Sequence, residues 1–142
     1  MSTLLQSSIL NTIKQMLGID ETFNGFDPEI TIDINSALMN LHQIGIGPSD
    51  GFQIASEEDA WGDLTTDVSQ LDGVKTYIYL KTRLLFDPPS NSFLVQSMEK
   101  QIKELEWRLN VNAKEHLMNY GQYLPMMSPQ STSQSRLDRT AP

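Results

Sequence analysis

The chain has 142 residues, no cysteine and a formal net charge of −8. The length fits one domain, and the lack of cysteine excludes disulfides, thiolate metal sites and cysteine nucleophiles. The excess of acid argues against a general binder of nucleic-acid phosphates, because such binding depends on lysine and arginine. No apolar run approaches the roughly 20 residues that span a bilayer, and the N-terminus lacks a signal-peptide pattern, so we expect a soluble intracellular protein with no membrane partner.

The charge is divided unevenly along the chain. Residues 1–72 contain 12 acidic residues and a single base, Lys14, for a charge of −11, whereas residues 73–142 contain 6 acidic and 9 basic residues, for +3. Two solvated faces of different composition would explain this division. Alternatively, the acidic part of one subunit meets the basic part of the next, a head-to-tail contact that can close into a ring.

The first third of the chain predicts two helices joined by a loop. The first helix spans residues 4–17, ends at Gly18 and has an apolar face of Leu5, Ile9, Ile13, Met16 and Leu17. Asp27, Pro28 and Glu29 then predict a helix start, with Asp27 as the cap, whose replacement by alanine would cost about 1 kcal/mol. The second helix carries Ile30, Ile34, Ala37, Leu38 and Leu41 on one face. The alternation of residues 30–34 would also fit a strand, but the proline start and the continuation to Leu41 favour a helix.

Residues 44–54 contain three glycines and a proline and predict an irregular connection, in which Phe52 and Ile54 alternate like a short extended segment. Ser56 and Asp59 fit the two ends of a capping box, which predicts a short helix that buries Trp61 and Leu64. Asp67 or a neighbouring hydroxyl is expected to cap the next helix, in which Gly73 is a weak point.

The stretch 74–109 predicts two long helices that meet at a break. Before the break, the apolar face consists of Val74, Tyr77, Ile78, Leu80, Leu84 and Leu85. Asp87, Pro88 and Pro89 form a structural hinge, because proline lacks a backbone N–H and disfavours helical geometry in the residue before it. Ser90 or Ser92 is expected to cap the second helix, which has a narrow seam of Leu94, Met98, Ile102, Leu105 and Leu109. Trp107 lies off this seam beside Arg108, where it would either pack on the domain or face a neighbouring subunit. Trp107 and Arg108 are both candidate residues of a portal or subunit interface.

The composition changes after Gly121. Residues 121–142 have no periodic apolar face, several prolines and many serines, so they predict an extended or disordered tail. A floppy terminus is one reading. The alternative is that the tail docks in a groove of another chain through its apolar side chains, Tyr120, Tyr123, Leu124, Met126 and Met127. The fold class is therefore all-α: a small helical bundle with a long C-terminal helix, an irregular or extended excursion around residues 44–55, and an extended tail. The expected domains are 1–120 and 121–142.

No catalytic, cofactor-binding or metal-binding set is predicted. His42 and His116 lie on separate predicted helices without metal-ligand spacing. The acidic residues Glu57, Glu58, Asp59 and Asp63 lack the spacing of a calcium loop, and no phosphate loop or nucleophile motif is present. We therefore expect no enzyme; a hydrolase with unassigned carboxylates ranks far below the other possibilities.

Several segments between residues 9 and 110 resemble the head–tail connector (adaptor) proteins of tailed bacteriophages. The more specific ones are VKTYIYLK at 74–81 and LFDPP at 85–89. The others are LGID at 17–20, Phe26-Asp27, the helix of residues 30–41, GIGP at 45–48, Trp61, and QIKELEWRLN at 101–110.

This resemblance implies a helical structural subunit of the virion neck, made in the cytoplasm of the bacterial host. Its implied partners are copies of itself in a dodecameric ring, the portal protein above, and a downstream neck or tail-completion protein. DNA would pass through the channel of the ring without specific binding, and a C-terminal segment would grip the portal or a neighbour. The alternative from another class is a small acidic helical module that regulates a partner by occupying its basic surface.

Overall fold

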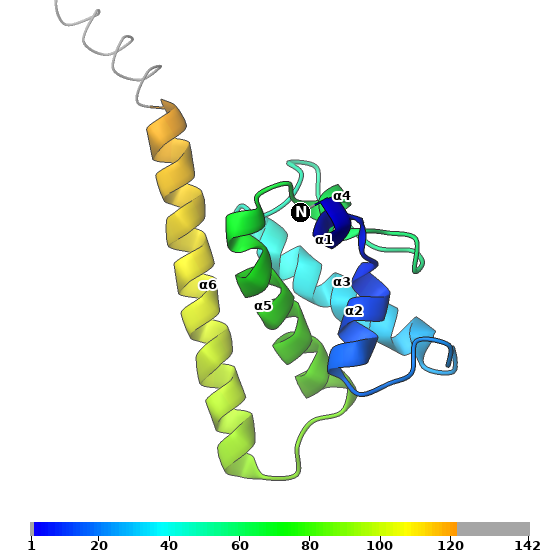
Figure 1. Cartoon of the computed structure of the whole chain (residues 1–142). Coiled ribbons are helices and arrows are strands. Elements are labelled where there is room, and N and C mark those ends of the chain that lie inside the picture. Colours follow the sequence, from blue (N-terminus) through cyan, green and yellow to red (C-terminus); the bar gives the residue numbers. More distant parts are fainter. Residues whose placement is uncertain (1, 122–142) are drawn as a thin grey trace, which may run out of the picture. The chain divides into compact units, whose positions relative to one another are not determined.

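Figure 1 shows a computed structural model of the chain, which describes residues 2–121 and the side chains of residues 4–114. The described part forms six helices: α1 (Ser2–Gln6), α2 (Ile9–Met16), α3 (Asp27–Gln43), α4 (Trp61–Leu64), α5 (Val68–Phe86) and α6 (Ser92–Gly121). The predicted all-α class is confirmed, with its long C-terminal helix and the irregular excursion around residues 44–55. The predicted tail lies almost wholly outside the described residues.

The chain divides after Asn110 into two units, Met1–Asn110 and Val111–Pro142. Helix α6 begins in the first unit, and residues 111–121 of this helix are the described part of the second. The predicted boundary near residue 120 stays a prediction. All contacts discussed below belong to the first unit.

The core of the first unit is α3 packed along α5, with α2 against both. Helix α3 buries all five residues of its predicted face, so the helical interpretation is correct and the strand alternative is wrong. In α5, the predicted residues Val74, Tyr77, Ile78 and Leu80 are buried. Leu85 is exposed and Leu84 only partly buried, contrary to prediction, because both line an open hollow beside α6.

The part of α6 that belongs to the first unit, residues 92–110, lies on the side of α5 away from α2 (Figure 1). Its seam buries Met98, Ile102 and Leu109 as predicted. Leu94 is exposed, contrary to prediction, because α6 begins beyond the end of α5 and its first turn has no helix to pack on. A hydrogen bond of 2.7 Å from the Tyr77 hydroxyl to the Glu106 carboxylate also joins α5 to α6.

The predicted helix of residues 4–17 is in fact two helices, because the backbone between them pairs with another segment. Trp61 N–H donates to the Ser7 carbonyl at 3.1 Å, and Ile9 N–H donates to the Asp59 carbonyl at 3.0 Å. These bonds form an antiparallel bridge at Ser8 and are incompatible with a continuous helix. The Ser8 hydroxyl then caps α2 by accepting from Asn11 N–H. Met16, predicted to be buried, is exposed at the end of this helix.

Two of the predicted helix caps are wrong. Helix α3 begins at Asp27 itself, after Phe26, and has no side-chain cap, because the Asp27 carboxylate pairs with Lys14. Helix α6 is capped by neither Ser90 nor Ser92. The Asn91 side chain, one residue before the helix, accepts hydrogen bonds from the N–H groups of the next turn.

Two other predicted helix starts, at Asp67 and at Ser56, have different outcomes. The predicted cap at Asp67 is confirmed, since its side chain accepts from Ser69 N–H at the start of α5. The Asp59 carboxylate reaches back to Ser56 N–H as in a capping box, but the segment is a turn. The short helix begins only at Trp61, where it buries Trp61 and Leu64 as predicted.

Candidate assembly surfaces

The predicted hinge residues Asp87, Pro88 and Pro89 lie in the connection between α5 and α6. Asp87 ends α5 by donating its N–H to the Arg83 carbonyl, and the Arg83 guanidinium donates to the Asp87 carbonyl at 2.8 Å. This mutual pair fixes the direction in which the chain leaves α5. The connection therefore has a defined start.

Trp107 and Arg108, two predicted interface residues, lie on an exposed face of α6. The Trp107 side chain is 68% exposed, which is unusual for the largest apolar side chain. It lines an open hollow of about 440 Å³ together with Lys100, Lys103, Glu104 and Arg108. We call this the Trp107 hollow. It combines an aromatic surface with three cations and one carboxylate.

A second hollow, of about 360 Å³, lies beside it and shares Lys103. The elements that line it are α3, α5 and α6, through Ser36, Lys81, Leu84, Leu85, Glu99, Ile102, Lys103 and Glu106. The two hollows share Lys103, and their linings combine apolar side chains with both cations and carboxylates. Large exposed surfaces of this composition are typical of protein-binding sites.

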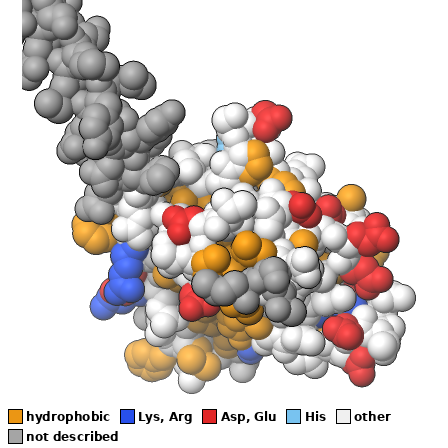
Figure 2. Space-filling model, turned by 45° about the horizontal axis from the view of Figure 1, so that its top comes forward, with side chains coloured by type: hydrophobic (Ala, Val, Ile, Leu, Met, Phe, Trp, Pro, Cys, Tyr) orange, Lys and Arg blue, Asp and Glu red, His pale blue; other side chains and the backbone are white. Residues whose placement is uncertain are grey.

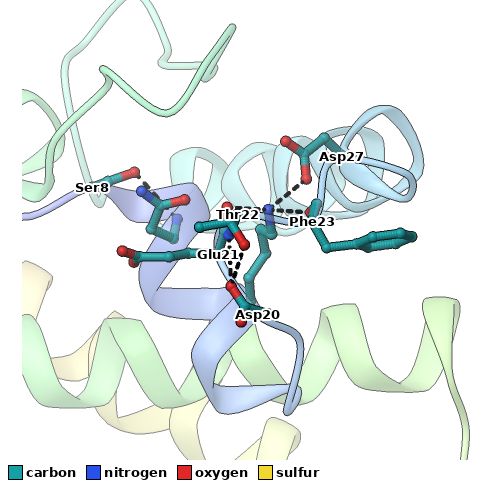
Figure 3. A network of polar contacts seen from close by, with 8 residues as sticks. Ser8, Asp20, Glu21, Thr22, Phe23 and Asp27 are labelled. Atoms are coloured by element: carbon teal, nitrogen blue, oxygen red, sulfur yellow. Dashed lines mark hydrogen bonds and ion pairs between the residues drawn. The ribbon is translucent and has the colours of Figure 1, made fainter.

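Lys14, the single base of the acidic half, holds the loop of residues 19–26 through bonds to its backbone. Figure 3 shows the loop residues Asp20, Glu21, Thr22 and Phe23 together with Asp27 in this polar network. The Lys14 ammonium donates to the carbonyls of Glu21 at 3.0 Å and Phe23 at 2.7 Å. Its nitrogen also lies 2.9 Å from the Asp27 carboxylate; the approach is an ion pair and not an aligned hydrogen bond. The Lys14 side chain is only 1% exposed, so the loop closes over it.

The outer surface of this loop is acidic and aromatic. The Asp20 carboxylate accepts from both the N–H and the hydroxyl of Thr22, and these bonds hold the pKa of Asp20 below its ordinary value. Phe23 and Phe26 are 49% and 44% exposed and touch edge to face, with ring centroids 5.3 Å apart. Phe26 continues this contact to Phe86 at the end of α5. A fixed aromatic surface flanked by Asp20 and Glu21 results.

Acidic and basic side chains gather on different sides of the first unit. Figure 2 shows red carboxylates mainly on one side of the molecule and blue cations mainly on the other. In Figure 1, loop 19–26 lies on the side of α5 opposite α6. On the face shown, the uneven charge of the sequence is therefore a partial separation in space, because Glu99, Glu104 and Glu106 lie on α6 among its cations.

A third hollow, of about 350 Å³, is lined by α3 and the irregular excursion. The Asn35 side chain fixes the excursion by accepting from Ile54 N–H and donating to the Ile54 carbonyl. His42 and Asp50 both line this hollow, and no group of three possible metal ligands occurs in the described part of the chain. None of the described helices has the length and apolarity needed to cross a membrane.

The remaining predicted interface residues are Tyr120, Tyr123, Leu124, Met126 and Met127, whose side chains lie outside the described residues, as does that of His116. The role of Lys14 and the contacts among Phe23, Phe26 and Phe86 were not predicted from the sequence. A signal for Lys14 was present in the sequence, because a single base among the 12 carboxylates of residues 1–72 indicates a specific partner for its charge.

These features define a class: a small all-α protein with opposed charged surfaces, suited to assembly with other chains. The particular family follows from comparison, because residues 9–116 match the family described as phage connector protein. The chain belongs to this family, and the membership supports a connector role in the phage neck, in association with portal and tail components. Neither the curated proteins nor the solved structures contain a match.

Proposed function

We propose that this protein is a structural subunit of the phage neck that forms a ring beneath the portal, joins head to tail and extends the DNA channel. The ring would be dodecameric, with the portal on one side and a downstream neck or tail-completion protein on the other. DNA would pass through without specific binding. The protein would work through its surfaces and not by catalysis.

The family membership over residues 9–116 is the observation that carries this proposal. The separation of charge supports the ring. Acidic loop 19–26 and the basic Trp107 hollow lie on opposite sides of α5, and contacts between unlike faces propagate from subunit to subunit until the rotation closes a ring.

The acidic half also suits a channel. A net charge of −11 over residues 1–72 repels DNA phosphates, and a wall that repels DNA does not retain it during passage. The inner wall of the proposed ring would be formed by part of this acidic half.

The portal contact is assigned to the tail, whose apolar residues Tyr123, Leu124, Met126 and Met127 would become ordered on the portal or on a neighbouring subunit. Trp107 and Arg108 would belong to a subunit contact. The regulatory-module alternative has no comparable support, because the family is one of connectors.

Deletion of residues 121–142 tests the proposal. The truncated chain should keep the helical circular dichroism of the full chain but lose attachment to the portal protein of the same phage, measured by co-sedimentation. A matched full-length variant with Tyr123, Leu124, Met126 and Met127 changed to serine should lose attachment too, which separates apolar docking from tail length. Normal attachment by both variants would refute the tail contact.

A further inference from the structure

We propose that loop 19–26 of one subunit docks into the Trp107 hollow on α6 of the next copy. This inference rests on the proposed function, since it specifies how neighbours in the ring touch. The partner is a second copy of this chain, because both complementary surfaces are present on one molecule.

The loop has the properties of a preformed docking element. Lys14 binds two of its carbonyls and the Asp27 carboxylate, and Asp20 closes a turn onto Thr22. A loop already fixed in this way loses little conformational entropy on binding. Its exposed Phe23 ring, about half accessible, lies within a segment that also carries Asp20 and Glu21.

The hollow complements the loop in aromatic character and charge. Trp107 offers an exposed aromatic surface, and aromatic pairs prefer offset or edge-to-face contacts such as Phe23 can make. Lys100, Lys103 and Arg108 around it would meet the carboxylates of Asp20 and Glu21. Glu104 is the one carboxylate that lines the hollow. The docked loop would leave the Glu104 side chain in solvent, because its charge would repel Asp20 and Glu21.

The loop cannot fill the hollow of its own chain. In Figure 1 it lies on the far side of α5 from α6, with the core helices between them. Each subunit therefore offers a loop at one side and a hollow at the other. The resulting contact is heterologous and propagates in one direction, as a ring requires.

Cysteine cross-linking tests this contact cleanly, because the natural chain has no cysteine. Glu21→Cys and Lys103→Cys are made as separate full-length chains. The two chains are mixed with each other, in one sample without and in one sample with the portal protein of the same phage, and are then oxidised. Glu21 and Lys103 are both exposed, and the Lys14 bond uses the Glu21 carbonyl, so both variants should fold. A disulfide-linked heterodimer is expected, and a chain carrying both cysteines should form a ladder of multimers.

Ser49→Cys, exposed in the irregular excursion, mixed with Lys103→Cys is the matched control and should give no dimer above background. Charge reversal gives an independent readout. Glu21→Lys or Lys103→Glu alone should weaken self-association about tenfold, and the two reversals together should restore most of it.

One result would overturn this contact and leave the proposed function standing. In that result the chain assembles in many copies with the portal, but Glu21→Cys and Lys103→Cys form no preferential link and the paired charge reversals do not restore self-association. If the full-length chain forms no multi-copy assembly even with the portal, the proposed function is overturned, and this contact with it.

Discussion

Removing the Lys14 ammonium should destabilise the protein far more than a surface lysine would. Lys14→Met keeps most of the aliphatic stem but deletes two hydrogen bonds to carbonyls and the ion pair with Asp27. Breaking a buried ion pair by removing one partner costs about 3–5 kcal/mol. Because the Asp27 side chain is 26% exposed and can regain water, the lower figure applies, about 3 kcal/mol.

The converse substitution should cost more. Asp27→Ala leaves an ammonium with 1% exposure and no countercharge, so we expect about 4 kcal/mol. A simple helix cap, as the sequence suggested for Asp27, would cost about 1 kcal/mol. Glu29→Ala is the matched control, because Glu29 is an exposed acid in the same first turn and its favourable interaction with the helix dipole is worth about 0.3–1 kcal/mol.

Urea unfolding followed by circular dichroism measures these differences, and the double variant Lys14→Met with Asp27→Ala completes a cycle. Because both singles break one interaction, the double variant should cost clearly less than their sum, with a coupling of about 1–3 kcal/mol. Lys14→Met should also lower the melting temperature by about 10 °C. A loss below about 1 kcal/mol for Lys14→Met together with additive effects would refute the reasoning.

The remaining stability predictions concern Tyr77 and two glycines. Burial, with the hydrogen bond to Glu106, raises the pKa of the Tyr77 phenol above its ordinary value of about 10, so its contribution is complete below pH 10 and is lost as the pH rises further. Stability measured by urea unfolding from pH 8 to 11 should therefore fall more steeply in the natural chain than in Tyr77→Phe; parallel curves would contradict this. Gly62→Ala should cost about 1–3 kcal/mol, because the new Cβ would lie 2.9 Å from the Leu5 carbonyl oxygen. Gly73→Ala should stabilise by about 0.5–1 kcal/mol, because its Cβ would meet the side chains of Leu109 and Leu105 at ordinary distances of 3.6 and 3.9 Å; equal melting temperatures for the two alanine variants would refute both statements.

Helix faces were predictable from the sequence because burial follows a local period. All five residues of the predicted apolar face of α3 and the first four of the predicted face of α5 are buried as their spacing predicts. Errors concentrate where a distant segment overrides local preference. The split between α1 and α2 depends on backbone bonds to residues 59 and 61, which no local pattern around Ser8 reveals.

The candidate surfaces were predictable only in part. The position of Trp107 off the α6 seam left open whether its side chain packs on the domain or is exposed, whereas the charge division was visible in the composition. The loop surface was not, because it depends on Lys14 meeting carbonyls seven and nine residues away. Asp27 matched the pattern of a helix cap, yet a full ion pair outweighs a cap bond once a lysine is buried beside it.

The mass of the complex between the full-length chain and the portal protein of the same phage tests the central claim most directly. Native mass spectrometry should show many copies of the chain on one portal ring, twelve if the ring is dodecameric. The variant that lacks residues 121–142 should show no copies bound to the portal ring. A chain that remains monomeric beside an intact portal ring, or that binds as a single copy, would contradict the account.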